Sequence, residues 1–216
     1  MSASPDVLHR MPKAEVHLHL EGTIAPETLW ALAARNHVAL PVGTLAELRQ
    51  LYAFDGFDRF VALWLAMCRC LRAPSDYEEM VDGFVAECRR QNIRYVEAHF
   101  TPYNHERFGF GGRRALDIVT RRLEVAESQT GTVTRLILDM PSESLPESGA
   151  FTAALLETEA NPIVVGVGLG GPEVGFPRTQ ALPFFDRARR AGYAAVAHAG
   201  ETGGADHVRQ AVVELG

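Results

Sequence analysis

Two histidines separated by a single residue lie near the start of this chain of 216 residues. They belong to segment 14–20 (AEVHLHL), whose apolar character predicts a β-strand. On a strand, His17 and His19 point to the same face, roughly 6.5–7 Å apart at Cα, because successive side chains alternate. Two neighbouring imidazoles can bind one cation, since zinc–nitrogen bonds are about 2.0–2.1 Å long. The spacing alone leaves the alternative open that both are hydrogen-bonded core or edge histidines.

A second segment whose residues could take part in catalysis or metal binding lies near the other end of the sequence. Residues 193–204 (YAAVAHAGETGG) comprise a short apolar strand, then His198, then a glycine-rich turn that carries Glu201. A histidine at a strand end, followed three residues later by an acid, is a plausible metal ligand with a general acid/base. Helices expected over 178–191 and 204–215 place this strand in a βα unit, and in barrels of such units chemistry gathers at the C-terminal strand ends.

The elements that must position these residues alternate regularly along the chain. Strands are expected over 14–20, 93–100, 133–139, 163–169 and 193–198. Helices are expected over 26–36, 45–51, 57–71, about 75–91, 111–130, roughly 147–160, 178–191 and 204–215. Strands separated by helices indicate parallel βαβ units. Five units form either the first five-eighths of an eight-unit barrel or an open sheet of different topology.

Two finer features of the expected helices concern how they start and what they bury. Ser75 and Glu78 have the spacing of a capping box, which predicts a helix start there. The helix expected over 57–71 is almost wholly apolar and should be buried. Phe60, Trp64 and Met67 lie in it, as helical core or, alternatively, as the wall of a substrate entrance.

Composition narrows the class of protein. The chain is 47% hydrophobic and 22% charged, as expected for a globular protein. Its net charge of −6 and its lack of a basic run argue against a nucleic-acid partner. No apolar stretch approaches the ~20 residues of a membrane span, and the N-terminus lacks the apolar core of a signal peptide. We therefore expect a cytoplasmic protein without a membrane partner.

The cysteines and the single lysine limit the kinds of metal site. Cys68, Cys70 and Cys88 lie in apolar helical segments, and their odd number predicts reduced core thiols. Cys68 and Cys70 face different directions on a helix, and thiolate zinc sites usually use C-x₂₋₄-C spacing, so metal binding there is disfavoured. Lys13, the only lysine, precedes the first expected strand, so none of the later expected strands contains a lysine that could take part in a metal site.

Three segments resemble motifs of the adenosine deaminase family. Residues 11–22 (MPKAEVHLHLEG) are similar to the family's opening strand, 169–173 (LGGPE) to its loop after strand four, and 198–201 (HAGE) to its fifth-strand motif. The motifs occur in the family's order, and the match spans nearly the whole chain. The resemblance implies an α/β fold of the TIM-type (β/α) barrel, one catalytic divalent metal, usually Zn²⁺, and hydrolytic deamination of a 6-aminopurine.

The resemblance also implies roles for individual residues. His17, His19 and His198 would bind one Zn²⁺ per chain, which lowers the pKa of water toward ~7. Glu201 would be catalytic and would donate a proton to purine N1, for which a closed apolar pocket must raise its pKa. The backbone around Gly171 would hydrogen-bond the purine, and Glu21 would contact the sugar or nearby groups.

Two further polar residues end expected strands. His99 could contact the substrate, and its alternative role is that of a satisfied surface histidine. Asp139 ends the third expected strand, where loop capping competes with a substrate role.

The sequence also departs from the family's pattern. Family members continue into strands six to eight, which supply a further histidine and an aspartate that completes the metal site, whereas this sequence ends at Gly216. We therefore expect residues 1–216 to form a single metal-dependent hydrolase domain, incomplete at its C-terminus and inactive alone. No later strand offers the lysine that bridges two metals in binuclear amidohydrolases, which indicates a mononuclear site. The Pro-Cys-x-x-Cys element of cytidine-type deaminases is absent.

The sequence leaves alternatives open for the substrate and for the class of function. The loop 168–177 favours a nucleoside, adenosine or 6-aminodeoxyfutalosine, over adenine, because its start (GLGGPE) is less polar than the adenine-specific form. The alternative functions are adenine deamination and a truncated, non-catalytic metal- or purine-binding module. The expected partner is a small-molecule purine, and the sequence is compatible with a homo-oligomer.

Overall fold

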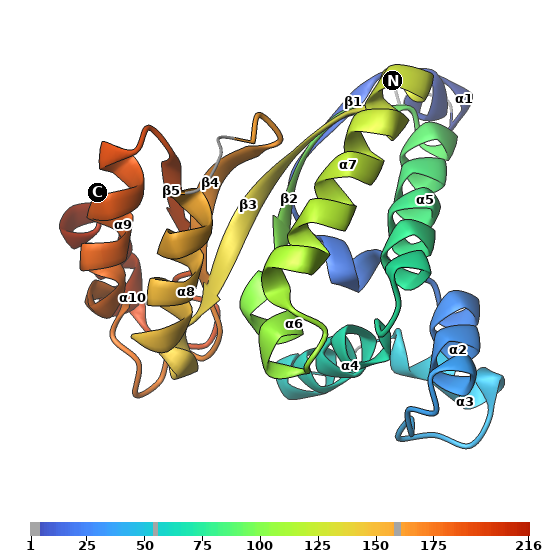
Figure 1. Ribbon diagram of the computed structural model, residues 1–216, viewed down its shortest axis with the longest axis horizontal. Coiled ribbons are helices and arrows are strands. Elements are labelled where there is room, and N and C mark those ends of the chain that lie inside the picture. The colour runs from blue at the N-terminus through green and yellow to red at the C-terminus, as the bar shows by residue number, and fades with distance from the viewer. Residues whose placement is uncertain (1–4, 54–55, 158–160) are drawn as a thin grey trace. The chain divides into compact units, whose positions relative to one another are not determined.

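The computed structural model describes residues 5–53, 56–157 and 161–216. Five strands form one sheet in the order of the sequence (Figure 1): β1 (Lys13–His19), β2 (Ile93–Phe100), β3 (Val133–Pro141), β4 (Val164–Gly170) and β5 (Ala194–Ala197). β3 pairs with β4, and β4 with β5, in parallel register. All five predicted strands are confirmed to within two residues. The alternation of strands and helices is that of the first five βα units of a TIM-type barrel, as predicted.

Helices occupy most of the chain between the strands. They are α1 (Pro5–Arg10), α2 (Pro26–Arg35), α3 (Leu45–Leu51), α4 (Phe57–Cys70), α5 (Pro74–Arg90), α6 (Pro102–Arg107), α7 (Gly112–Thr130), α8 (Glu147–Leu156), α9 (Leu182–Arg190) and α10 (Ala205–Arg209). Short 3₁₀ turns cover Leu20–Thr23, Ser142–Ser144 and Arg178–Ala181, and a π turn covers Gln210–Glu214. The short helices α1 and α6 were not predicted.

The helix ends follow local chemistry, with one correction to the sequence interpretation. The capping box predicted at Ser75 and Glu78 is wrong, because α5 begins at Pro74, a residue suited to the first helical position. The Asp76 carboxylate instead accepts the backbone N–H groups of Arg72 and Ala73, each at 2.8 Å. The helix expected over 147–160 ends at Leu156 in the structure, and residues 158–160 lie outside the described chain.

The chain divides into two compact units. Unit 1 comprises Met1–Ala98 and Asn104–Thr134. Its helices α5 and α7 pack along each other (Figure 1). α4 buries Leu63, Met67 and Cys68 but exposes residues on its other side, so the expected burial holds for one side of the helix only. The three cysteines are free and buried, which confirms them as core thiols.

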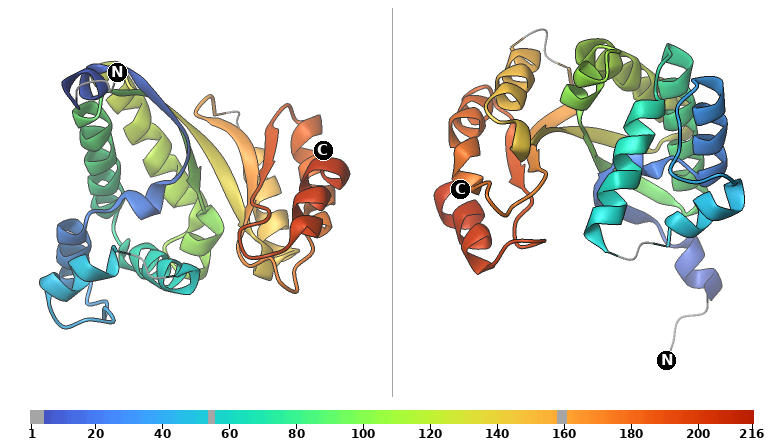
Figure 2. Two further views of the ribbon diagram at one scale, coloured as in Figure 1. Left: turned by 180° about the vertical axis from the view of Figure 1, so that it is seen from behind. Right: turned by 90° about the horizontal axis from the view of Figure 1, so that it is seen from below.

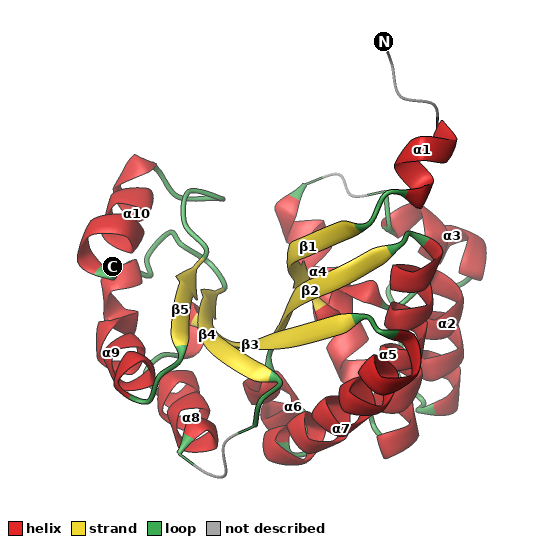
Figure 3. Ribbon diagram, turned by 90° about the horizontal axis from the view of Figure 1, so that it is seen from above, coloured by secondary structure: helices red, strands yellow, loops and turns green. Residues whose placement is uncertain are grey.

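Unit 2 comprises His99–Tyr103 and Arg135–Gly216. α8 and α9 pack together beside its strands (Figure 2). Its core brings together apolar side chains of β3, β4, α9 and the C-terminal segment, among them Met140, Leu169, Phe185 and Leu215. In Figure 3, β4 and β5 lie side by side, with their C-terminal ends leading into the loops that carry the candidate site residues.

Within the described part of the chain, no helix combines the length and the apolar character that a membrane crossing requires. The expectation of a single domain over residues 1–216 stays a prediction.

Candidate metal and acid/base site

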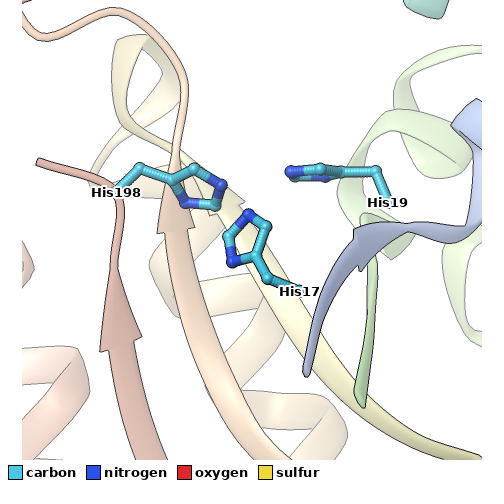
Figure 4. A group of neighbouring side chains, drawn as sticks. All are labelled: His17, His19 and His198. Atoms are coloured by element: carbon cyan, nitrogen blue, oxygen red, sulfur yellow. The ribbon is translucent and has the colours of Figure 1, made fainter. Parts of the chain in front are cut away.

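The two histidines of β1 lie close together, as their spacing predicts. The ring centroids of His17 and His19 are 5.6 Å apart, with an edge-to-face angle of 75° (Figure 4). Trp64 of α4 packs edge-to-face on His19 at 6.1 Å between ring centroids, which supports the His19 ring from within unit 1. His17 is exposed and His19 is half-buried.

His198 follows β5 directly and is tied to β4 (Figure 4). Its backbone N–H donates to the Leu169 carbonyl at 2.9 Å, and its ring Nδ1 lies 3.0 Å from the same oxygen. A carbonyl oxygen only accepts hydrogen bonds, so Nδ1 carries the ring proton in this contact. In the neutral ring the lone pair is then on Nε2, which is the form that binds a metal.

Glu201 lies in a turn whose backbone is held by another acid. Its side chain is exposed, whereas the Glu173 carboxylate is 99% buried and accepts the backbone N–H of Glu201 at 2.9 Å. Burial raises the pKa of Glu173, but hydrogen bonds from the amides of Glu201 and its neighbours outweigh burial and lower that pKa overall. The sequence interpretation gave Glu173 no role, although it ends the LGGPE motif.

Gly171 is fixed as glycine by its surroundings. It follows β4 with φ of +81°, a left-handed conformation that side chains disfavour. A Cβ at this position would lie 2.4 Å from Glu143 Oε2 and 3.0 Å from the Ser142 amide nitrogen. The backbone of this loop is thus packed closely against the turn that follows β3, and its predicted contact with a purine stays a prediction.

His99 and Asp139 form a buried pair inside unit 2. His99 Nδ1 lies 2.8 Å from Asp139 Oδ1, and both residues are almost fully buried. His99 is therefore not a surface histidine, and Asp139 lies within β3 and pairs with a ring instead of capping a loop. The His198 ring packs edge-to-face on His99 at 5.2 Å between centroids. Donor atoms of His99, Asp139 and His198 all lie within 4.8 Å of one another, so they are a candidate metal-binding group.

A second buried polar group lies in unit 1. The ring nitrogens of His105 contact Glu21 Oε1 at 3.3 Å and Tyr77 Oη at 2.9 Å. Glu21 is completely buried, and its predicted contact with a substrate sugar stays a prediction. Cys68 is near enough to complete a candidate metal-binding group, but burial raises the pKa of its thiol well above the ordinary value. Thiolate, the form that binds metals, is therefore disfavoured there.

Comparison with known proteins assigns the chain to a family. Candidate histidines and acids at the ends of successive strands are the arrangement of a TIM-type barrel enzyme. The sequence matches the adenosine deaminase family over residues 12–216, and the chain belongs to this family.

Individual relatives agree with the family assignment. The chain is 32% identical to an adenine deaminase of Wolinella succinogenes over 215 residues, 100% of this chain and 65% of that protein. It is 36% identical to an adenine deaminase of Bordetella parapertussis over 207 residues, 96% of this chain and 65% of that protein. The chain thus spans just under two thirds of the length of these relatives.

Solved structures give the same result. The crystal structure of an adenine deaminase from Arthrobacter aurescens superposes with a TM-score of 0.86 at 32% identity, covering 94% of this chain and 62% of that chain. A zinc-bound amidohydrolase from Burkholderia ambifaria superposes with a TM-score of 0.89 at 25% identity, covering 100% of this chain and 60% of that chain.

Proposed function

We propose that this chain carries the histidine cluster and the proton-transferring acid of a metal-dependent 6-aminopurine deaminase. The reaction replaces the 6-amino group by oxygen from water and releases ammonia. The observation that carries the proposal is the pair of adjacent imidazoles on β1, His17 and His19, within a sequence that matches the deaminase family from residue 12 onward. The relatives' activities are consistent with this class of reaction.

The chemistry of the histidines fits a zinc ion. We assign His17, His19 and His198 as its ligands, because imidazole nitrogens suit Zn²⁺ and the His198 tautomer presents Nε2. A bound zinc ion would supply Lewis acidity and an activated water. The relative with bound zinc supports the choice of metal.

Glu201 is the residue of this chain suited to move the proton. In the proposed reaction its carboxyl group donates to N1 of the purine ring as the 6-position is attacked, and the carboxylate recovers a proton from water. The backbone around Gly171 would orient the ring, because Gly171 is exposed and has no side chain to keep the purine from the main chain. His17, His19 and His198 act in this proposal as metal ligands only and do not exchange protons with the substrate.

The free base adenine is the substrate we propose. Both curated relatives described above and one of the structures are adenine deaminases at 32–36% identity. The sequence interpretation favoured a nucleoside because the start of the 168–177 loop is less polar than the adenine-specific form, and that preference stays a prediction. The three candidate substrates, adenine, adenosine and 6-aminodeoxyfutalosine, are distinguished by the rate at which the natural protein that contains these residues releases ammonia from each. We expect adenine to react fastest, and faster reaction of a nucleoside would contradict the choice.

Metal binding tests the ligand assignment directly. Equilibrium dialysis of the 216-residue chain with zinc should give one ion per chain. Single substitutions His17→Ala, His19→Ala and His198→Ala should each weaken binding by at least about tenfold, because each removes one of three ligands. His9→Ala in α1 is the matched control, since it removes an exposed histidine outside the cluster. Equal binding by all four variants would overturn the assignment.

The proton-transfer role has its own test. Glu201→Gln keeps the shape of the side chain but cannot donate the proton, so it should lower the rate of ammonia release by about 10²–10⁴-fold. Zinc content should stay unchanged in this variant. Retention of zinc and of purine binding without ammonia release in the unsubstituted natural protein would instead favour the non-catalytic binding module that the sequence left open.

A further inference from the structure

The turn that carries Glu201 directs its backbone amides at one buried carboxylate. Glu173 Oε2 accepts the N–H of Gly200 at 3.0 Å and that of Gly203 at 2.9 Å, while Oε1 accepts the N–H of Glu201 at 2.9 Å. Three amides on one side chain are an unusually complete set of donors, and such hydrogen bonds to an ionised acceptor are the stronger kind. The carboxylate therefore fixes the backbone on both sides of Glu201.

The glycines of the turn allow the backbone to approach this carboxylate closely. A Cβ at Gly203 would lie 2.4 Å from Glu173 Oε2 and 2.3 Å from His207 Nδ1, so only glycine allows the close approach. Gly200 has φ of +82°, a left-handed conformation that turns its N–H toward the acid. His207 Nε2 completes the contact by donating to the Glu173 carbonyl at 2.9 Å, which joins α10 to the same loop.

A buried arginine links this loop to His198. Arg178 is completely buried, and its Nη2 donates to the carbonyls of Pro172 at 2.5 Å and Phe176 at 2.9 Å. Its Nη1 lies 3.5 Å from the His198 carbonyl. The guanidinium thus spans from the loop after β4 to the first residue of the candidate site after β5.

The charge of Arg178 is balanced locally. Burial lowers its pKa, whereas the nearby carboxylates of Glu173 and Glu143 favour the charged form. A buried charge persists more readily when it is hydrogen-bonded, and this guanidinium donates to the carbonyls of Pro172, Phe176 and His198. Glu173 and Arg178 therefore form one polar unit inside unit 2, which we call the Glu173–Arg178 brace.

We infer that the Glu173–Arg178 brace positions the backbone of His198 and Glu201 against the loop that carries Gly171. Under the proposed function, on which this inference rests, that loop orients the purine and the braced turn supplies the acid. The brace makes the two loops move as one body. Glu173 and Arg178 are positioning residues, because neither is proposed to touch the substrate or the metal.

Amide hydrogen exchange tests the brace without reference to activity. Glu173→Gln replaces one acceptor oxygen by an NH₂ group, which cannot accept the amides. We expect exchange at Gly200, Glu201 and Gly203 to become at least tenfold faster. Glu157→Gln is the matched control, because it removes an exposed carboxylate of unit 2 that pairs with Arg187. Unchanged exchange at the three amides in Glu173→Gln would overturn the brace.

A second variant disturbs the same contact by changing the glycine of the turn in place of the carboxylate. Gly203→Ala places a methyl group 2.4 Å from Glu173 Oε2 and must displace it, so it should also accelerate exchange at Gly200 and Glu201 while leaving the carboxylate intact. Glu173→Asp keeps the charge and should restore part of the protection. Protection that is equal in Glu173→Asp and Glu173→Gln would contradict a role for the carboxylate charge.

Metal binding and kinetics test positioning as distinct from stability. Glu173→Gln should weaken zinc binding by about tenfold through His198, as loss of outer-shell support typically does. In the natural protein it should lower kcat at least tenfold with less than a threefold change in KM. Unchanged zinc affinity and kcat would overturn the positioning role. A wild-type chain that binds no zinc would contradict the proposed function, while the exchange result would still decide the brace.

Discussion

Gly168 of β4 leaves room for the buried pair of His99 and Asp139. A Cβ at this glycine would lie 1.8 Å from Asp139 Oδ1 and 3.2 Å from His99 Nδ1. Gly168→Ala must therefore displace the acid and weaken its hydrogen bond to the ring. We expect a loss of about 2–4 kcal/mol in the free energy of unfolding, because overpacking and a disturbed buried polar pair act together. Urea unfolding at neutral pH measures this difference.

Gly83→Ala is the control for the glycine substitution. Gly83 is an exposed position of α5 where an added Cβ meets no atom within 4 Å. Alanine is favoured over glycine inside a helix by roughly 0.5–1 kcal/mol, so this variant should be slightly more stable than wild type. A Gly168→Ala variant as stable as Gly83→Ala would show that the pair does not need this space.

The Glu173 carboxylate predicts a specific pH dependence of stability. Its pKa in the folded protein is lower than its ordinary value, because the turn amides outweigh burial. The stabilisation is then fully present above the unfolded pKa, about 4.3, and is lost as the pH falls through the lower folded pKa. Wild type should exceed Glu173→Gln in unfolding free energy at pH 7, and this gap should shrink below pH ~4. A gap that stays constant from pH 7 to 3 would contradict the assignment.

At the residue scale, the sequence singles out the candidate ligands and the candidate acid more readily than the residues that support them. His17, His19, His198 and Glu201 are recognisable because their types and spacings are rare outside metal and acid/base sites. Glu173 and Arg178 are not, because their partners are backbone amides and carbonyls, which carry no sequence signature. The His99–Asp139 pair was missed for a different reason, since its two members lie forty residues apart on separate strands.

Helix α3 provides a test at the scale of a single element. Thr44 Oγ1 accepts the Glu47 N–H at 3.2 Å, and Glu47 Oε2 accepts the Thr44 N–H at 3.1 Å, which completes a capping box. Thr44→Ala should cost about 1 kcal/mol, as the loss of an N-cap side chain typically does. Ser128→Ala in α7 is the control, because its exposed hydroxyl donates only to a carbonyl of its own helix. Equal effects of the two substitutions on the urea midpoint would refute the capping role.

The elements themselves were predictable where periodicity was strong. β2 and α3 have the predicted bounds, because apolar alternation and a clear helical pattern define them. The start of α5 was misplaced because Pro74 begins the helix and Asp76 supplies the cap. The sequence SDYE has the letters of a capping box two residues after the observed N-cap, Ala73. α1 and α6 were missed because each has only six residues, too few to show a period.

At the scale of the whole molecule, the order of the five strands follows directly from the sequence. Strands separated by helices pair in parallel with their neighbours along the chain, which is the order observed. The division of the chain into two units was not predictable, because its boundaries fall inside β2, α6 and β3 and in no linker. Residues on one continuous strand thus belong to different compact units.

The response of stability to zinc gives a test of the proposed ligand set. Both tryptophans, Trp30 and Trp64, belong to unit 1, and their fluorescence follows the unfolding transition. His198 belongs to unit 2. If one zinc ion takes ligands from β1 and from His198, zinc at 100 times its Kd should stabilise the fluorescence-detected transition by about 2.7 kcal/mol. His198→Ala should then remove most of that shift, although it changes no residue of unit 1.

The competing arrangement makes the opposite prediction. If zinc binds instead to His99, Asp139 and His198, all ligands belong to unit 2. The stabilisation by zinc should then survive His17→Ala. Asp139→Asn separates the cases, because it removes a ligand only from the second arrangement. A fluorescence shift that survives Asp139→Asn but disappears in both His17→Ala and His198→Ala requires one ion held by both strand ends, and a shift lost only in Asp139→Asn would refute the proposed site.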